Sequence, residues 1–195
     1  MRFKYALARG ALIPRTGTGL ILGRRHFLTA AGISLFVPQA ARADEGRGRS
    51  LSFDNLHTGE KLRVEYWADG RYLPDALAEV NYLLRDFRTD QVHAIAPQLL
   101  DLLTRLRTRM DTSQPVNVIS AYRSPVTNAM LRAEHEHSGV ASKSLHLQGM
   151  AIDIRIPGRA LADLHMAALA ERGGGVGYYP RSDFVHVDVG RVRNW

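Results

Sequence analysis

Apolar and polar positions alternate in some stretches after residue 50 and recur at helical spacing in others. Alternation predicts strands, whereas apolar residues three and four positions apart predict helices. The expected strands are 51–56 and 61–67, joined as a hairpin, followed by 116–119, 150–156, 176–179 and 184–189. The expected helices are 74–87, 96–110, 125–135 and 160–171. We expect an α+β fold, a single compact domain with a small, mostly antiparallel sheet and helices packed against it.

Two of the expected strands place polar side chains opposite an apolar face. In 150–156 three isoleucines share one face, and Asp153 lies on the other. In 184–189 three valines share one face, and His186 and Asp188 lie on the other. If these strands are neighbours, Asp153 and His186 face a common groove.

The formal net charge of +7 is concentrated in the first 43 residues. This segment holds seven of the 26 basic residues and none of the 19 acidic ones, so the remainder is neutral. Nucleic-acid binding requires clustered Lys and Arg side chains, and a neutral remainder gives no support for it.

The same segment is typical of an export signal. Arg24 and Arg25 precede the apolar run 28–37, and Ala41-Arg42-Ala43 forms an A-x-A cleavage site. The paired arginines followed by Phe-Leu resemble a twin-arginine signal, although an ordinary Sec signal or an uncleaved amphipathic anchor stays open. The apolar run is too short for a stable membrane span. We expect a leader at 1–43, a linker at 44–50, a domain at 51–195 and a periplasmic location.

His146, Asp153 and His186 have the composition of a catalytic zinc site. Two imidazoles and one carboxylate hold the ion and leave a fourth position open. His146 and Asp153 follow the spacing H-x-x-G-x-A-x-D, and His186 lies on the later strand. The chain contains no cysteine, which excludes thiolate ligands, a cysteine nucleophile and disulfides.

This arrangement resembles the LAS group of zinc metallopeptidases, and within it the murein endopeptidase K-like family. The resembling segments are Leu56–Glu60, Leu84–Arg88, Ser120–Ser124 and Phe184–Gly190. The resemblance implies one zinc ion per chain, held at the sheet. It also implies an enzyme of the cell envelope that cleaves peptide cross-links of peptidoglycan.

The resemblance assigns roles to two further residues. Asp183, three positions before His186, is the candidate general base, which takes a proton from a zinc-activated water. Strand alternation puts residues three apart on opposite faces, so Asp183 must lie in the preceding turn. Arg123 is expected to hold a substrate carboxylate or a developing oxyanion. Alternatively, Asp183 is an ordinary turn residue and Arg123 caps a helix.

Several alternatives remain open from the sequence. Asp153 could pair with Arg155 as a strand-end charge, and Asp188 could either orient a ligand or be such a charge. The enzyme could be a D,D- or L,D-carboxypeptidase acting on stem peptides. It could also be a non-catalytic, zinc-stabilised module that binds peptidoglycan.

Overall fold

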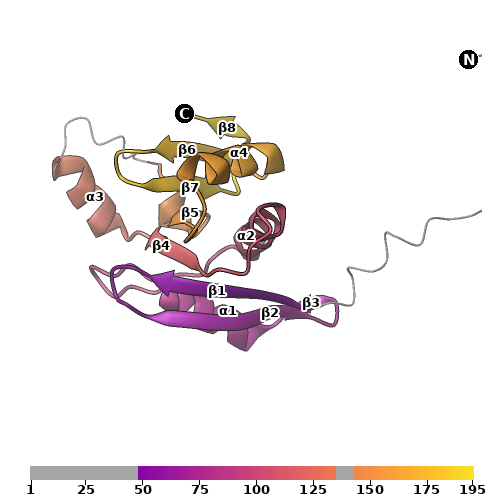
Figure 1. The fold of residues 1–195 in the computed structure, drawn as a ribbon. Coiled ribbons are helices and arrows are strands. Elements are labelled where there is room, and N and C mark those ends of the chain that lie inside the picture. Colours follow the sequence, from indigo (N-terminus) through magenta and orange to yellow (C-terminus); the bar gives the residue numbers. More distant parts are fainter. Residues whose placement is uncertain (1–47, 135–142) are drawn as a thin grey trace, which may run out of the picture. The chain divides into compact units, whose positions relative to one another are not determined.

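A mixed sheet of eight strands organises the structure (Figure 1), a computed structural model that describes residues 48–134 and 143–195. The strand order is β3-β2-β1-β4-β5-β7-β6-β8. The strands are β1 Arg49–Asn55, β2 Lys61–Ala68, β3 Arg71–Tyr72, β4 Val116–Ser120, β5 Ala151–Arg155, β6 Gly175–Tyr179, β7 Phe184–Asp188 and β8 Arg193–Asn194. The β1–β4 and β6–β8 pairs are parallel, and the others are antiparallel. The mostly antiparallel sheet is as expected, but it is larger than the small sheet that we predicted.

Four α-helices complete the described part of the chain: α1 Pro74–Leu83, α2 Pro97–Arg109, α3 Pro125–Glu134 and α4 Leu161–Glu171. Proline opens the first three, where its missing N–H costs no helical hydrogen bond. Helices α2 and α4 pack against each other, α2 against β1, and α4 against β6 and β7 (Figure 1). Their buried leucines meet the isoleucines of β5 and the valines of β7 in one core. The opposite face of β5 and β7 remains available for polar chemistry.

Helix α1 ends at Leu83, four residues before the end that the apolar spacing predicted. The backbone turns there because the buried carboxylate of Asp86 accepts hydrogen bonds from the backbone N–H groups of Arg88 and Ser124, at 3.0 and 2.8 Å. Phe87 therefore does not belong to the helix. Its ring stacks on His57 instead, with ring centroids 4.0 Å apart.

The hairpin of β6 and β7 is confirmed, but the chain does not end with it. A short strand, β8, follows and pairs in parallel with β6. This strand contains Arg193, and Trp195 follows it at the edge of the sheet face that carries Asp153 and His186. A two-residue strand has too few positions for an alternation to be recognised, which explains why the sequence pattern missed it.

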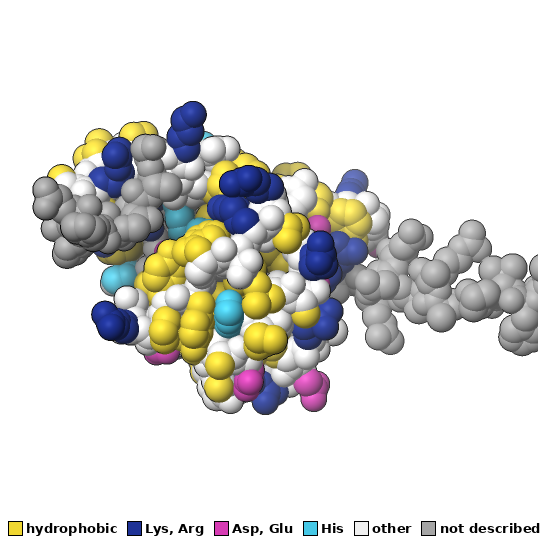
Figure 2. All heavy atoms as spheres, turned by 90° about the horizontal axis from the view of Figure 1, so that it is seen from above, with side chains coloured by type: hydrophobic (Ala, Val, Ile, Leu, Met, Phe, Trp, Pro, Cys, Tyr) yellow, Lys and Arg dark blue, Asp and Glu magenta, His cyan; other side chains and the backbone are white. Residues whose placement is uncertain are grey.

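The expected export signal lies outside the described residues. None of the helices in the described ranges is long and apolar enough to cross a membrane. On the face drawn in Figure 2, Lys and Arg side chains are scattered among apolar and uncharged ones rather than gathered into one stripe. This face therefore adds no support for nucleic-acid binding.

Candidate metal centre

Strand register brings two of the expected ligands together. Strands β5 and β7 are neighbours, and Asp153 on β5 lies directly opposite His186 on β7. Both residues are buried, at 5 and 8% exposure. The prediction that they face each other from adjacent strands is confirmed.

His146 approaches the same point from the short 3-10 helix Leu145–Gln148, directly before β5. The Ser144 hydroxyl accepts a hydrogen bond from the backbone N–H of His146 at the start of this helix. Gly149 ends it in a left-handed conformation, with φ of 63°. A Cβ atom there would lie 2.2 Å from the carbonyl oxygen of Ala94, so the G of the H-x-x-G spacing is required for this close approach.

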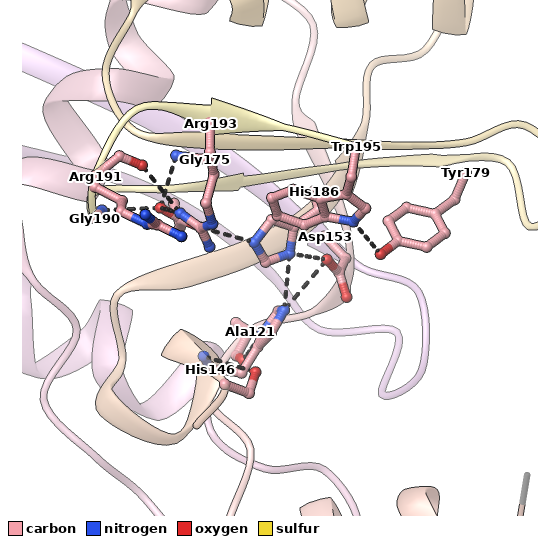
Figure 3. Close-up of polar contacts among 12 residues, drawn as sticks. Ala121, His146, Asp153, Gly175, Tyr179, His186, Gly190, Arg191, Arg193 and Trp195 are labelled. Atoms are coloured by element: carbon pink, nitrogen blue, oxygen red, sulfur yellow. Dashed lines mark hydrogen bonds and ion pairs between the residues drawn. The ribbon is translucent and has the colours of Figure 1, made fainter. Parts of the chain in front are cut away.

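The three side chains form a triangle of ligand atoms (Figure 3). The Nε2 of His146 lies 3.2 Å from Nδ1 of His186 and 3.3 Å from Oδ1 of Asp153, and the third edge is 2.9 Å. Zinc with ligands at about 2.0–2.1 Å in a tetrahedron requires ligand atoms about 3.3 Å apart. The triangle therefore matches one face of a zinc coordination tetrahedron.

The outer nitrogen of each imidazole fixes which nitrogen is free to bind a metal. The Nδ1–H of His146 donates to the carbonyl oxygen of Ala121 at 2.6 Å, because a carbonyl can only accept. The Nε2–H of His186 donates to the carboxylate of Asp188 at 3.2 Å. The two inner nitrogens then present lone pairs toward Oδ1 of Asp153. When both imidazoles are neutral, these three acceptors converge on one point, so a cation between them, either a proton on one imidazole or a metal ion, is needed to balance them.

The charges of this group shift its pKa values in opposite directions. Burial alone would raise the pKa of Asp153, but the positive charge and hydrogen bonds of His146 and His186 hold it well below its usual range. Burial alone would lower the pKa of His186, but hydrogen bonds to the carboxylates of Asp153 and Asp188 raise it. The carboxylate is thus kept ionised, as a metal ligand must be.

The carboxylate of Asp188 holds the imidazole of His186 in place and is not only a charge at the end of a strand. It is completely buried and accepts hydrogen bonds from the backbone N–H groups of Gly175 and Gly190 at 2.8 and 2.9 Å. Arg193 of β8 adds two more, at 3.1 and 2.7 Å (Figure 3). These partners outweigh the effect of burial and hold the pKa of Asp188 well below its usual range. A fixed, ionised carboxylate of this kind orients the imidazole that it contacts.

Arg123 lies beside the candidate ligands. Its backbone N–H donates to the carbonyl oxygen of His146, and its Nη2 lies 3.8 Å from Oδ2 of Asp153. The side chain is buried, and within the described part of the chain its Nε has no hydrogen-bond partner. Burial lowers the pKa of Arg123, and the charge of Asp153 opposes that effect. Capping of α3 falls to Ser124, whose hydroxyl accepts from the N–H of Thr127, so Arg123 remains available for another role.

Asp183 lies in the turn between β6 and β7, as strand alternation required. Its backbone is left-handed, with φ of 54°, and its side chain is 60% exposed. The carboxylate forms an ion pair with Arg155, which lies two residues after Asp153 on β5. Arg155 thus pairs with Asp183, and the pairing of Asp153 with Arg155 that the sequence left open is not observed. Asp183 is not one of the three converging groups.

Three contributions to the site were not foreseen: the carbonyl of Ala121, the guanidinium of Arg193 and the indole of Trp195. Ala121 belongs to a segment that the family resemblance had already marked, but a carbonyl oxygen leaves no signature in a sequence. Arg193 and Trp195 are two positions apart, which places strand residues on one face, but the segment is too short for this spacing to be recognised in the sequence.

Comparison with known proteins agrees with this geometry. The family model described as "Peptidoglycan L,D-endopeptidase MepK" matches residues 43–195. A protein of that name from Escherichia coli (strain K12) is 45% identical over 178 residues, which cover 88% of this chain and 96% of the relative. A "Probable peptidoglycan L,D-endopeptidase MepK" from Haemophilus influenzae is 40% identical, with 88 and 95% covered. The chain belongs to the MepK family of peptidoglycan endopeptidases, which the four sequence segments had indicated.

Proposed function

We propose that this protein is a zinc-dependent endopeptidase that hydrolyses peptide cross-links of peptidoglycan. The observation that carries the proposal is the buried triangle of His146, Asp153 and His186 in a chain of the MepK family. The names of the relatives support an L,D-endopeptidase in particular.

His146, Asp153 and His186 would hold one zinc ion. Such an ion keeps a fourth position for water or substrate and supplies Lewis-acid chemistry at a peptide carbonyl. Ala121 and Asp188 accept hydrogen bonds from the outer ring nitrogens of the two histidines, which leaves the inner nitrogens to face the ion, and Asp153 is kept ionised.

Arg123 would stabilise negative charge on the substrate. It is buried next to Asp153, where water screens its charge poorly, and its Nε has no partner among the described residues. A developing oxyanion, or a carboxylate of the substrate, would occupy this donor position. Contact with a developing oxyanion would favour a catalytic site over a module that only binds, because such a module has no charge development to stabilise, whereas contact with a carboxylate would fit either.

Asp183 would exchange protons with the reacting groups. Arg155 holds its carboxylate in the turn directly before β7, the strand that carries His186, and the side chain is exposed. Asp183 lies outside the triangle of converging ligand atoms, which makes this assignment the first one to test.

An endopeptidase and a carboxypeptidase differ in whether the substrate needs a free terminal carboxylate. The zinc-loaded protein should be incubated with purified cross-linked muropeptide dimers and with uncross-linked stem peptides, and the product masses measured. We expect the dimers to become monomers while the stems keep their length. Shortened stems with intact dimers would instead identify a carboxypeptidase.

The leader would export the protein to the periplasm, where peptidoglycan is available. The support is the sequence pattern of residues 24–43 and the cell-wall substrates in the names of its relatives.

A further inference from the structure

The indole of Trp195 lies against a candidate metal ligand and is still half-exposed. Its ring centroid is 5.2 Å from that of His186, and 50% of the residue is accessible (Figure 3). A large apolar ring at the rim of a buried polar centre is available to whatever enters that centre.

The ring is held firmly although it is not buried. Its Nε1–H donates to the hydroxyl of Tyr179 at 2.7 Å, and the backbone N–H of Trp195 donates to the carbonyl oxygen of Val176. The ring also needs Gly177 beneath it, because a Cβ atom there would lie 2.7 Å from the indole. These contacts fix the orientation of the indole before any ligand arrives, so that little entropy is lost when one binds.

The surface that the Trp195 ring presents is apolar rather than positively charged. The guanidinium of Arg193 lies 4.9 Å from the indole centroid, but it is already paired with Asp188. Behind Trp195, the ring of Tyr179 stacks on that of Phe184, with centroids 4.6 Å apart. Aromatic surface thus continues from the metal ligand toward the hairpin turn.

We propose that Trp195, supported by Tyr179, binds the aliphatic side chain of the substrate residue next to the scissile bond. This inference rests on the proposed peptidase function and adds a specificity residue to it. An extended peptide advances about 3.3 Å per residue. A group that touches Trp195 while the carbonyl is at the metal centre therefore belongs to a flanking residue and not to a distant part of the substrate.

The first test is kinetic and uses zinc-loaded Trp195→Ala and Trp195→Phe. Two sugar-free cross-linked peptides are compared, with either norleucine or alanine beside the scissile bond. In Trp195→Ala we expect kcat/KM to fall about tenfold for norleucine, mainly through KM, with little change for alanine. Trp195→Phe should retain most of the preference. Met166→Ala, an exposed apolar residue on α4, is the control.

The outcome that would overturn the proposal is an equal loss on both peptides, because it would mean that Trp195 only packs against His186. Zinc content measured beside the rates would then fall as well. A defect confined to sugar-bearing substrates would also overturn it, since the ring would contact a saccharide rather than a side chain.

A second measurement separates this inference from the proposed function. Trp67→Phe leaves Trp195 as the only tryptophan, since the chain has two. Binding of a norleucine peptide whose scissile amide is reduced should shift the Trp195 emission to shorter wavelength, because the side chain displaces water. If the protein cleaves peptides but the emission stays unchanged, the inference fails and the function stands. If the emission shifts but no peptide is ever cleaved, the function fails and the subsite stands.

Discussion

Asp153 and His186 face each other across paired strands, with Oδ1 of the one 2.9 Å from Nδ1 of the other. Backbone hydrogen bonds between β5 and β7 fix this separation, so two of the three candidate ligands do not depend on a loop for their position. Placement on regular elements holds a site more accurately than placement on loops does.

Asp188→Asn tests whether the buried carboxylate supports His186. The amide keeps the size of the side chain, but it loses the charge that balances Arg193 and accepts from His186. We expect zinc affinity to fall about 10–100-fold, as measured by competition with a chelator. Asp54→Asn, at an exposed ion pair with Lys61, should leave the affinity unchanged. Wild-type affinity in Asp188→Asn would mean that this carboxylate only stabilises the fold.

Asp183→Asn tests the proposed proton-transfer residue. The variant should fold and keep its zinc, because the side chain is exposed and lies outside the ligand triangle. If Asp183 transfers protons, turnover of a cross-linked peptide should fall by about 10²–10⁴-fold. Cleavage at the wild-type rate would show that Asp183 is a turn residue that pairs with Arg155.

Much of the site could be predicted because its ligands follow local rules. The H-x-x-G-x-A-x-D spacing and the alternation in β5 and β7 are properties of neighbouring residues. The roles of Asp188 and Trp195 depend on the pairing of β8 with β6, and no local pattern reports that pairing. The end of α1 at Leu83 likewise depends on Asp86, whose carboxylate is bound by a backbone N–H 38 residues away.

The lowered pKa of Asp86 also predicts how the stability of the protein depends on pH. Burial would raise its pKa, but its interactions with Ser124 and Arg88, whose backbone N–H groups donate to the carboxylate, and with the nearby Thr127 lower it to about 2. A group with a lowered folded-state pKa contributes stability above its unfolded-state value, and that stability is lost as the pH falls. We therefore expect the protein to lose the stability contributed by Asp86 between about pH 4 and pH 2.

Acid unfolding followed by circular dichroism checks this prediction. Asp86→Asn should be about 2 kcal/mol less stable at pH 7, and its stability should change less between pH 4 and pH 2 than that of the wild type. Asp54→Asn, in a surface ion pair with Lys61, serves as the control. Parallel acid curves for Asp86→Asn and the wild type would contradict a lowered pKa at this site.

Replacing Arg24 and Arg25 together by lysine tests the export route. If the twin-arginine pathway is used, unprocessed precursor should accumulate in the cytoplasm, because that pathway reads the arginine pair rather than its charge. The precursor and the processed form are separated by size in cell fractions. Normal processing of the lysine variant would indicate the Sec route.

The most direct test of the metal centre is a zinc titration of metal-free protein, with cleavage of a cross-linked muropeptide followed at each step. Activity should rise in proportion to bound zinc and level off at one ion per chain. His146→Ala and His186→Ala should bind little zinc and show no cleavage, since two ligands cannot close the site. Cleavage by the metal-free protein, or a full equivalent of zinc retained by both variants, would contradict the proposed zinc-dependent mechanism.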